Sequence, residues 1–138
     1  MRWEVVPRDG IVWINDAYNA NPTRMAKSLE TFAAMDAKCG RKVAVLGDMF
    51  ELGDRAEAMH RAVGTQVAAS GVDVLVAVGA MSAQWMADAA LKAGLAADRV
   101  LLAADAPAAR DLLKRLLKPG DHALLKASHG MALESILG

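Results

Sequence analysis

Short runs of apolar and β-branched residues alternate with longer amphipathic patterns along the whole chain. Six of these runs have the length of strands: 3–6, 11–15, 42–46, 74–78, 100–103 and 122–126. The last four are almost continuously apolar, which is typical of strands covered on both faces of a sheet. Because parallel strands need long, right-handed crossovers between them, the alternation predicts a mainly parallel sheet.

The segments between the runs carry start and stop signals of helices. Asn21 is placed as an N-cap with Pro22 at the first helical position, and Asp105 is placed to cap a later helix. We expect helices at 22–38, 54–70, 82–93, 105–117 and, with Ser128 as its cap, about 130–137.

These elements predict an α/β fold, a three-layer sandwich in which a mostly parallel sheet of about six strands has helices on both faces. Runs 3–6 and 11–15 are separated by four residues, so we expect a hairpin that leaves one antiparallel edge strand. The chain shows no internal repeat, linker or low-complexity tract. Residues 1–138 are therefore interpreted as one domain.

Composition excludes several classes of function. Sixteen basic residues balance sixteen acidic ones, so the chain lacks the positive charge typical of proteins that bind nucleic acid or anionic membranes. No apolar run approaches the ~18 residues of a membrane span, and the start lacks the apolar core of a signal peptide, so we expect a cytoplasmic protein. The one cysteine, Cys39, is interpreted as a structural thiol rather than a nucleophile.

Polar or glycine-rich segments follow three of the predicted strands, at 15–22, 47–54 and 127–130. The carboxyl ends of parallel strands share one edge of a sheet, and ligands of open α/β sheets bind in the crevice outside that edge. The opposite strand ends are joined by what look like ordinary turns. The asymmetry predicts a binding site at the carboxyl edge.

Each polar residue at this edge also has a purely structural interpretation. Asn21 is favoured as a helix cap, whereas Asp16 lies five residues earlier and is favoured as a ligand for a hydroxyl or a cation. For Tyr18 and His129 the packing and binding interpretations are equally balanced. Arg24 opposes the dipole of its helix by ~0.3–1 kcal/mol, a placement that suggests a nearby anion.

Several catalytic motifs are missing from the sequence. There is no P-loop, no glycine-rich dinucleotide fingerprint after the first strand, no nucleophile elbow and no cluster of metal ligands. Asp48 and Glu51 have the chemistry of Mg²⁺ ligands, but Mg²⁺ usually also takes substrate phosphates, and no phosphate cradle is visible. His60 is favoured as a packed histidine. We therefore assign no catalytic residue and no metal site.

Motifs spread over essentially the whole chain nevertheless match one family in order and spacing. They are Asp16-Ala17-Tyr18-Asn19-Ala20-Asn21-Pro22, Leu46-Gly47-Asp48-Met49 with Glu51-Leu52-Gly53, His60 with Val63-Gly64, and Gly120-Asp121 leading to Lys126 and Ser128. This set resembles the C-terminal domain of Mur ligases, and within that family it is most similar to the member that adds D-alanyl-D-alanine.

The resemblance implies the Rossmann-like lid of an ATP-dependent amide ligase of cytoplasmic peptidoglycan synthesis. In such enzymes ATP phosphorylates the terminal carboxylate of UDP-N-acetylmuramoyl-tripeptide, and the amine of D-alanyl-D-alanine attacks the acyl phosphate. An N-terminal domain holds the UDP-sugar, and a central ATPase holds the P-loop and Mg²⁺. This chain looks like the third domain alone, without a tightly bound cofactor.

The resemblance also implies roles for individual residues. Asp16 would accept hydrogen bonds from the ATP ribose, and Asn19 would lie near the nucleotide. The residues that would bind the other substrates are Tyr18, Asp48, Met49, Glu51, Lys126, Ser128 and His129. Two positions depart from the family pattern: His129 stands where an arginine is usual, and Arg24 where a serine is usual.

Two other functions remain open on the sequence. The chain could be a stand-alone module that binds a nucleotide or a small anion at the same edge. It could also be the same domain of another Mur or folylpolyglutamate-type ligase, although the loop 47–53 argues against that. As a ligase fragment, the isolated chain is expected to be inactive.

Overall fold

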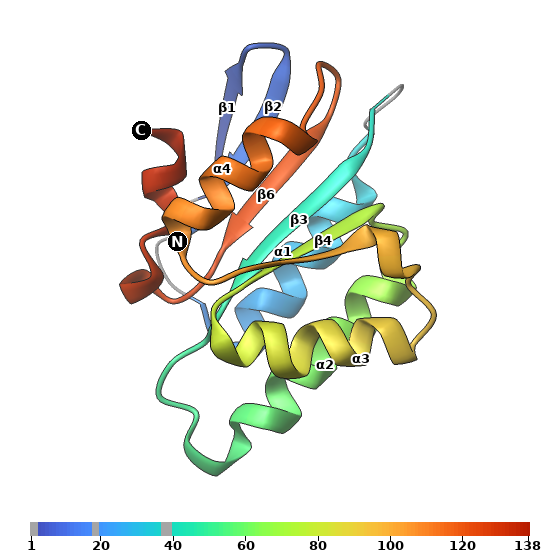
Figure 1. Ribbon diagram of the computed structural model, residues 1–138, viewed down its shortest axis with the longest axis vertical. Coiled ribbons are helices and arrows are strands. Elements are labelled where there is room, and N and C mark those ends of the chain that lie inside the picture. The colour runs from blue at the N-terminus through green and yellow to red at the C-terminus, as the bar shows by residue number, and fades with distance from the viewer. Residues whose placement is uncertain (1–2, 18–19, 37–39) are drawn as a thin grey trace.

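The computed structural model describes residues 3–17, 20–36 and 40–138, and within them six strands form one sheet. The order across the sheet is β1-β2-β6-β3-β4-β5, so the last strand of the chain lies between the second and the third (Figure 1). The strands are β1 (Glu4–Arg8), β2 (Ile11–Asn15), β3 (Lys42–Gly47), β4 (Val74–Val78), β5 (Val100–Ala103) and β6 (His122–Lys126).

The pairs β2–β6, β6–β3, β3–β4 and β4–β5 are parallel, and only β1 runs antiparallel to its neighbour β2. The turn between β1 and β2 contains Asp9 and Gly10, both at positive φ (55° and 79°). Positive φ at both central residues is the geometry of tight hairpin turns, which favour Asp-Gly. The predicted mostly parallel sheet and its antiparallel edge strand are therefore confirmed.

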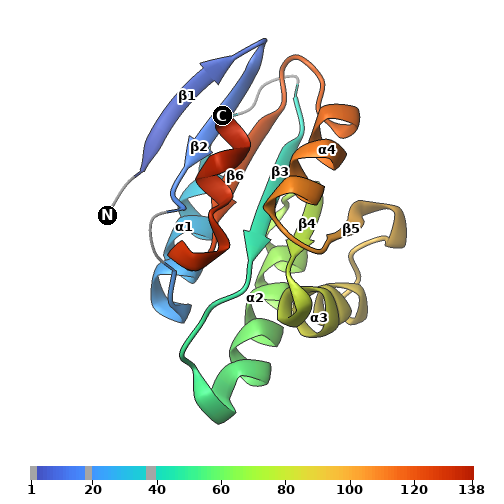
Figure 2. The ribbon, with the colours of Figure 1, turned by 60° about the vertical axis from the view of Figure 1, so that its left-hand side comes forward.

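Helices cover both faces of the sheet, as expected (Figure 2). On one face lie α1 (Pro22–Ala34), α2 (Ala56–Ser70) and α3 (Ala87–Lys92), whose apolar side chains share a buried cluster with Ile14, Leu46 and Leu75 of the sheet. On the other face α4 (Ala106–Leu116) and the C-terminal turns pack against side chains from β3, β4 and β6. The three-layer sandwich is confirmed.

Helices α1 and α2 are shorter than the sequence predicts. Helix α1 ends at Ala34, because Met35 is extended (φ −66°, ψ 144°) and its N–H bonds back to the carbonyl of Phe32. Residues 37–39, which include Cys39, lie outside the described part of the chain. The segment expected from 54 opens with a 3₁₀ turn, Gly53–Arg55, and α2 starts at Ala56 without a side-chain cap.

The segment expected as a helix from 82 opens with a π-helical turn, Ser82–Met86, ahead of α3. Gly64 of α2 packs against this turn, and a Cβ added to Gly64 would lie 2.0 Å from the carbonyl oxygen of Met86. The backbones of the two segments thus come close together at a point where one of them forms a wide π-helical turn and α2 has a glycine, which has no side chain to keep them apart.

The expected C-terminal helix is instead two 3₁₀ turns, His129–Met131 and Leu133–Leu137. Ala132 separates them in the left-handed region (φ 54°), which an α-helix cannot contain. Ser128 does not cap this segment with its side chain; its hydroxyl accepts the backbone N–H of Phe50 instead.

Candidate functional site

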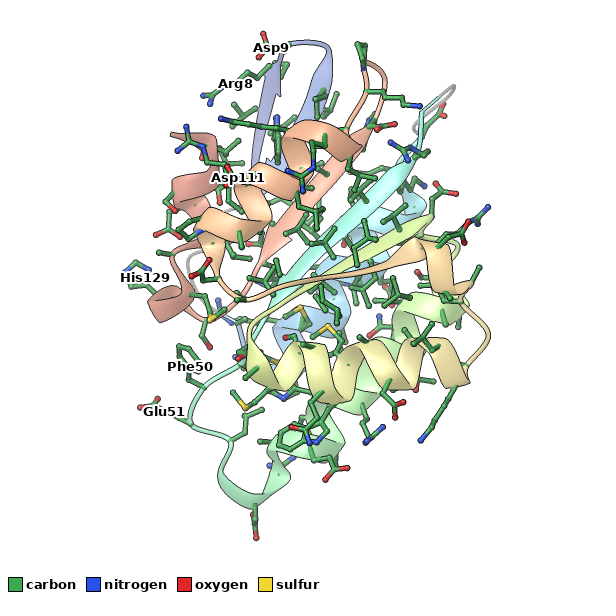
Figure 3. The ribbon with its side chains drawn as sticks, viewed as in Figure 1. Arg8, Asp9, Phe50, Glu51, Asp111 and His129 are labelled. Atoms are coloured by element: carbon green, nitrogen blue, oxygen red, sulfur yellow. The ribbon has the colours of Figure 1, made fainter. Side chains whose placement is uncertain are left out.

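Three loops meet at the carboxyl edge of the sheet and enclose a cavity of about 500 Å³. They follow β2, β3 and β6, which are neighbours in the sheet, so the predicted meeting of these loops is found. Phe50, Glu51 and His129 lie at this end of the molecule (Figure 3). The lining residues of this three-loop cavity are Ala20, Asn21, Phe50, Glu51, Leu52, Ser128, His129 and Gly130.

The loop after β3 is held by hydrogen bonds that two of its own successive backbone N–H groups donate. The N–H of Met49 donates to Nε2 of the buried His60 (3.0 Å), and the N–H of Phe50 donates to the hydroxyl of Ser128 (2.8 Å). Because Nε2 accepts, the proton of the neutral ring is on Nδ1, which donates to the carbonyl of Ala56 (2.7 Å). His60 is packed, as the sequence favoured, and it also anchors the loop.

Glu51 follows in the left-handed region (φ 63°) and is exposed. A left-handed conformation is costly for a non-glycine residue and persists only where the surrounding structure imposes it. Here the bonds to Met49 and Phe50 fix the backbone just before it. Glu51 therefore lines the three-loop cavity from a loop whose backbone is held in place.

Asp48 and Met49 have their side chains inside the domain. Asp48 is 6% exposed, and its carboxylate accepts the N–H groups of Met81 (3.3 Å) and Ser82 (2.7 Å), where the helical segment after β4 begins. A carboxylate there stabilises the helix start. Met49 is fully buried. Both side chains thus have structural contacts, and their binding of substrate stays a prediction.

Asp16 and Lys126 form a buried ion pair at the ends of β2 and β6. The carboxylate Oδ2 of Asp16 lies 3.0 Å from Nζ of Lys126 and accepts a hydrogen bond from the hydroxyl of Ser28 (2.5 Å). Nζ also donates to the backbone carbonyl of Asp16 (3.2 Å). Asp16 is 3% exposed and Lys126 2%, so two predicted site residues are buried and bind each other.

Asp16 and Ser28 also line a second cavity, of about 410 Å³, between Trp3 and the first turns of α1. Two cationic side chains, Arg24 and Lys27, line it from the helix. Asn21 caps that helix by accepting the N–H of Arg24 (2.9 Å), as expected. We call this space the Asp16 cavity. Tyr18 and Asn19, two further predicted site residues, lie outside the described residues.

A larger cavity of about 610 Å³ lies at the other end of the sheet and contains none of the predicted site residues. It is lined from the β1–β2 hairpin, α4 and the last turn, and its residues Arg8 and Asp9 lie far from Phe50 and Glu51 in Figure 3. In the described ranges 3–17, 20–36 and 40–138, no three His, Cys, Asp or Glu residues are grouped to hold a metal ion. No helix formed by those residues has the length and apolar character needed to cross a membrane.

Among the site residues that sequence reasoning missed are Phe50, Ser28 and Trp3. Phe50 carried a signal, since it is a single aromatic residue in a polar, glycine-rich loop. Ser28 carried none, because its pairing with Asp16 depends on how α1 packs. Trp3 was assigned to an edge strand, and its place beside the Asp16 cavity follows from the path of the chain before β1.

The comparisons with known proteins agree with this geometry. The family described as "Mur ligase, glutamate ligase domain" matches residues 1–129. UDP-N-acetylmuramoyl-tripeptide--D-alanyl-D-alanine ligase of Bacillus subtilis is 37% identical over 138 residues, covering 99% of this chain and 30% of that protein. The chain thus spans 30% of the length of this relative.

Solved structures give the same result. A MurF structure from Acinetobacter baumannii superposes with a TM-score of 0.80 at 30% identity, over 99% of this chain and 29% of that one. MurF ligase from Thermotoga maritima in complex with ADP gives a TM-score of 0.78 at 27% identity, with the same coverage. Since the family pattern spans residues 1–129 of 138, this chain belongs to the Mur ligase family and contains its glutamate ligase domain.

Proposed function

We propose that this chain is the C-terminal lid of an ATP-dependent ligase that joins D-alanyl-D-alanine to UDP-N-acetylmuramoyl-tripeptide. The observation that carries the proposal is the similarity of 99% of this chain to the Bacillus subtilis ligase of that name, combined with a cavity formed by the loops at which the sequence predicts binding. Because the chain covers 30% of that relative, the activity belongs to a longer protein.

The remaining parts of the ligase are assigned to two further domains, one for the UDP-sugar and one for ATP hydrolysis. The described residues contain neither a group of metal ligands nor a P-loop, so we assign Mg²⁺ and the phosphates of ATP mainly to the central domain. The similar Thermotoga maritima structure is in complex with ADP, which supports an adenine nucleotide as a ligand of the complete protein. The proposed location is the cytoplasm, where the nucleotide-linked precursor is made.

The Asp16 cavity is the proposed contact with the nucleotide. Both side-chain contacts of Asp16 within the described residues use Oδ2, so Oδ1 is available to accept a ribose hydroxyl. The cationic side chains Arg24 and Lys27 on the same wall suit an anionic ligand. Asn19, beyond the described residues, keeps its predicted place near the nucleotide.

The three-loop cavity is the proposed site of the dipeptide. Its volume of about 500 Å³ suits a small ligand, and it combines a carboxylate, an imidazole and a hydroxyl with apolar surface. D-Alanyl-D-alanine has an amine at one end and a carboxylate at the other. Glu51 would accept a hydrogen bond from the amine, while His129 and Ser128 would bind the carboxylate. Tyr18, Asp48, Met49 and Lys126 keep their predicted roles near the substrates.

In this mechanism the domain positions the reactants and excludes water. Closing the lid brings the amine of the dipeptide to the acyl phosphate held by the central domain, which removes much of the entropic cost of a bimolecular step. None of the described residues of this chain is assigned a proton transfer. The buried pair of Asp16 and Lys126 keeps the loops after β2 and β6 in register during closure.

The test compares the complete ligase with the isolated chain in an assay of phosphate release and product formation. The complete enzyme is expected to require ATP, the tripeptide nucleotide and D-alanyl-D-alanine, and the isolated 138 residues to give no turnover. Turnover by the isolated chain would contradict the proposal. So would nanomolar binding of ATP to the isolated chain by calorimetry, since that would indicate a stand-alone nucleotide-binding module.

A further inference from the structure

Phe50 is an exposed aromatic side chain in a cavity whose other walls are largely polar. It is 42% exposed, and it belongs to neither of the two buried apolar clusters. The other large apolar side chains that are exposed in the described residues, Val5, Leu91 and Leu102, do not line the three-loop cavity. An exposed apolar surface at a binding cavity is more often a contact for a ligand than a part of the core.

The structure holds this ring in a defined place. The backbone N–H of Phe50 donates to Ser128, and the N–H before it donates to His60. The ring packs over Gly130, where an added Cβ would lie 2.9 Å from a ring carbon. A side chain that is already fixed loses little conformational entropy when a ligand binds to it.

We propose that Phe50 forms the apolar wall that recognises the methyl side chains of the acceptor dipeptide. This inference rests on the proposed function. The polar groups of the cavity, on Glu51, Ser128 and His129, suit the two ends of a dipeptide, and they cannot distinguish alanine from glycine. In the described part of this cavity the ring of Phe50 is the largest exposed apolar surface that can do so.

The size of the effect follows from the area that a methyl group buries. Burial of one methyl group is worth about 0.8 kcal/mol, or roughly fourfold in kcat/KM. Phe50→Ala should therefore lower kcat/KM for D-alanyl-D-alanine by about fourfold for each methyl group that touches the ring. The kcat/KM for glycylglycine, which has neither methyl group, should change little.

The experiment uses the complete ligase and measures kcat/KM for four acceptors: D-alanyl-D-alanine, D-alanylglycine, glycyl-D-alanine and glycylglycine. The mixed dipeptides identify which methyl group meets the ring. Phe50→Leu should restore most of the discrimination, because it returns apolar surface at the same place. Leu91→Ala is the matched control, since Leu91 is equally exposed (42%) but lies on α3.

The outcomes separate this inference from the proposed function. Supporting results are a reduced preference for D-alanyl-D-alanine over glycylglycine in Phe50→Ala, an unchanged KM for ATP and unchanged preference in Leu91→Ala. If Phe50→Ala lowers kcat/KM equally for all four dipeptides, or for none, the role of Phe50 is overturned while the function stands. If the wild-type ligase does not accept D-alanyl-D-alanine at all, the proposed function fails, and the role of Phe50 fails with it.

Discussion

The hydroxyl of Ser128 accepts a hydrogen bond from the backbone N–H of Phe50 at 2.8 Å, across 78 positions of sequence. The N–H of Ser128 donates in turn to the carbonyl of Asp48 at 3.0 Å. These two bonds continue the pairing of β3 with β6 beyond the ends of both strands. The loops that carry Glu51 and His129 are thereby joined at the mouth of the three-loop cavity.

Ser128→Ala should loosen this junction. The N–H of Phe50 then loses its partner, at a cost of about 1–3 kcal/mol if no water replaces the hydroxyl. We expect KM for the dipeptide to rise more than KM for ATP in the complete ligase. Ser135→Ala is the control, because Ser135 is exposed and its hydroxyl donates to the carbonyl of Ala132, three residues earlier on the last turn. Equal effects of the two variants would count against the junction.

His60→Leu should detach the loop from α2. Leucine fills part of the space of the ring but offers no acceptor for the N–H of Met49, while His60→Gln can place a carbonyl oxygen near the position of Nε2. Hydrogen exchange of the Met49 amide, followed by NMR in the 138-residue chain, is expected to accelerate in His60→Leu and to recover in His60→Gln. Thr65→Ala, an exposed change on the same helix, should leave the amide protected. Equal protection in all variants would show that His60 does not hold the loop.

Lys126→Met should destabilise the domain by about 3–5 kcal/mol, because it leaves the carboxylate of Asp16 buried without its cation. Asp16→Asn in the same chain should recover much of this loss, since the uncompensated charge is then removed. Urea denaturation of the wild type, the two single variants and the double variant gives the coupling energy. Additive effects would mean that the two side chains are not paired in solution.

The pH dependence of stability should include a contribution from Asp121, at the opposite end of β6. Burial alone would raise the pKa of this carboxyl group, but hydrogen bonds from the Arg41 side chain and from the N–H groups of Lys118 and Arg41 hold it below its ordinary value. A carboxyl group with a lowered pKa in the folded state stabilises the protein above its unfolded pKa of ~3.9. That stabilisation is lost as the pH falls further, through the folded pKa.

Asp121→Asn should therefore cost about 1.5–3 kcal/mol at neutral pH, the value of hydrogen bonds to a charged group. The difference between wild type and variant should shrink as the pH falls below ~4, where the carboxyl of the unfolded wild type binds a proton, and it should go on shrinking as the pH falls through the lower pKa of the folded state. Chemical denaturation at several pH values measures it, with the exposed Asp98→Asn as the control. A difference that stays constant down to pH 2.5 would contradict the assigned pKa direction.

The features that the sequence predicted well are those with local causes. The predicted bounds of β2, β4, β5 and β6 agree with the structure, because each strand is a short apolar run between turn signals. Asn21 and Asp105 cap their helices as expected, since a cap needs only the N–H three residues ahead. The mainly parallel pairing of the strands follows from the alternation of strands and helices, whereas the order of the strands in the sheet was not predicted.

The features that could not be predicted depend on contacts between distant residues. The sequence shows Asp16 and Lys126 as two polar residues at one edge, but their mutual neutralisation is visible only when β2 and β6 lie side by side. Asp48 looked like a ligand group, yet it turns inward to the amides that begin the helical segment after β4. The left-handed conformation of Ala132 interrupts the helix that the pattern predicted near the C-terminus. It could not be foreseen, because alanine rarely adopts this conformation and nothing in the local sequence marks the position.

The position of β6 between β2 and β3 has a consequence for how this domain is made. Strands β2 and β3 are synthesised before β6, and until residues 122–126 have emerged from the ribosome each of them has an edge with unpaired backbone groups on the side that β6 later fills. Neither half can complete the sheet alone. Because β6 inserts between two strands that are made earlier, the sheet and the loops at its carboxyl edge are expected to assemble only after residues 122–126 have been synthesised.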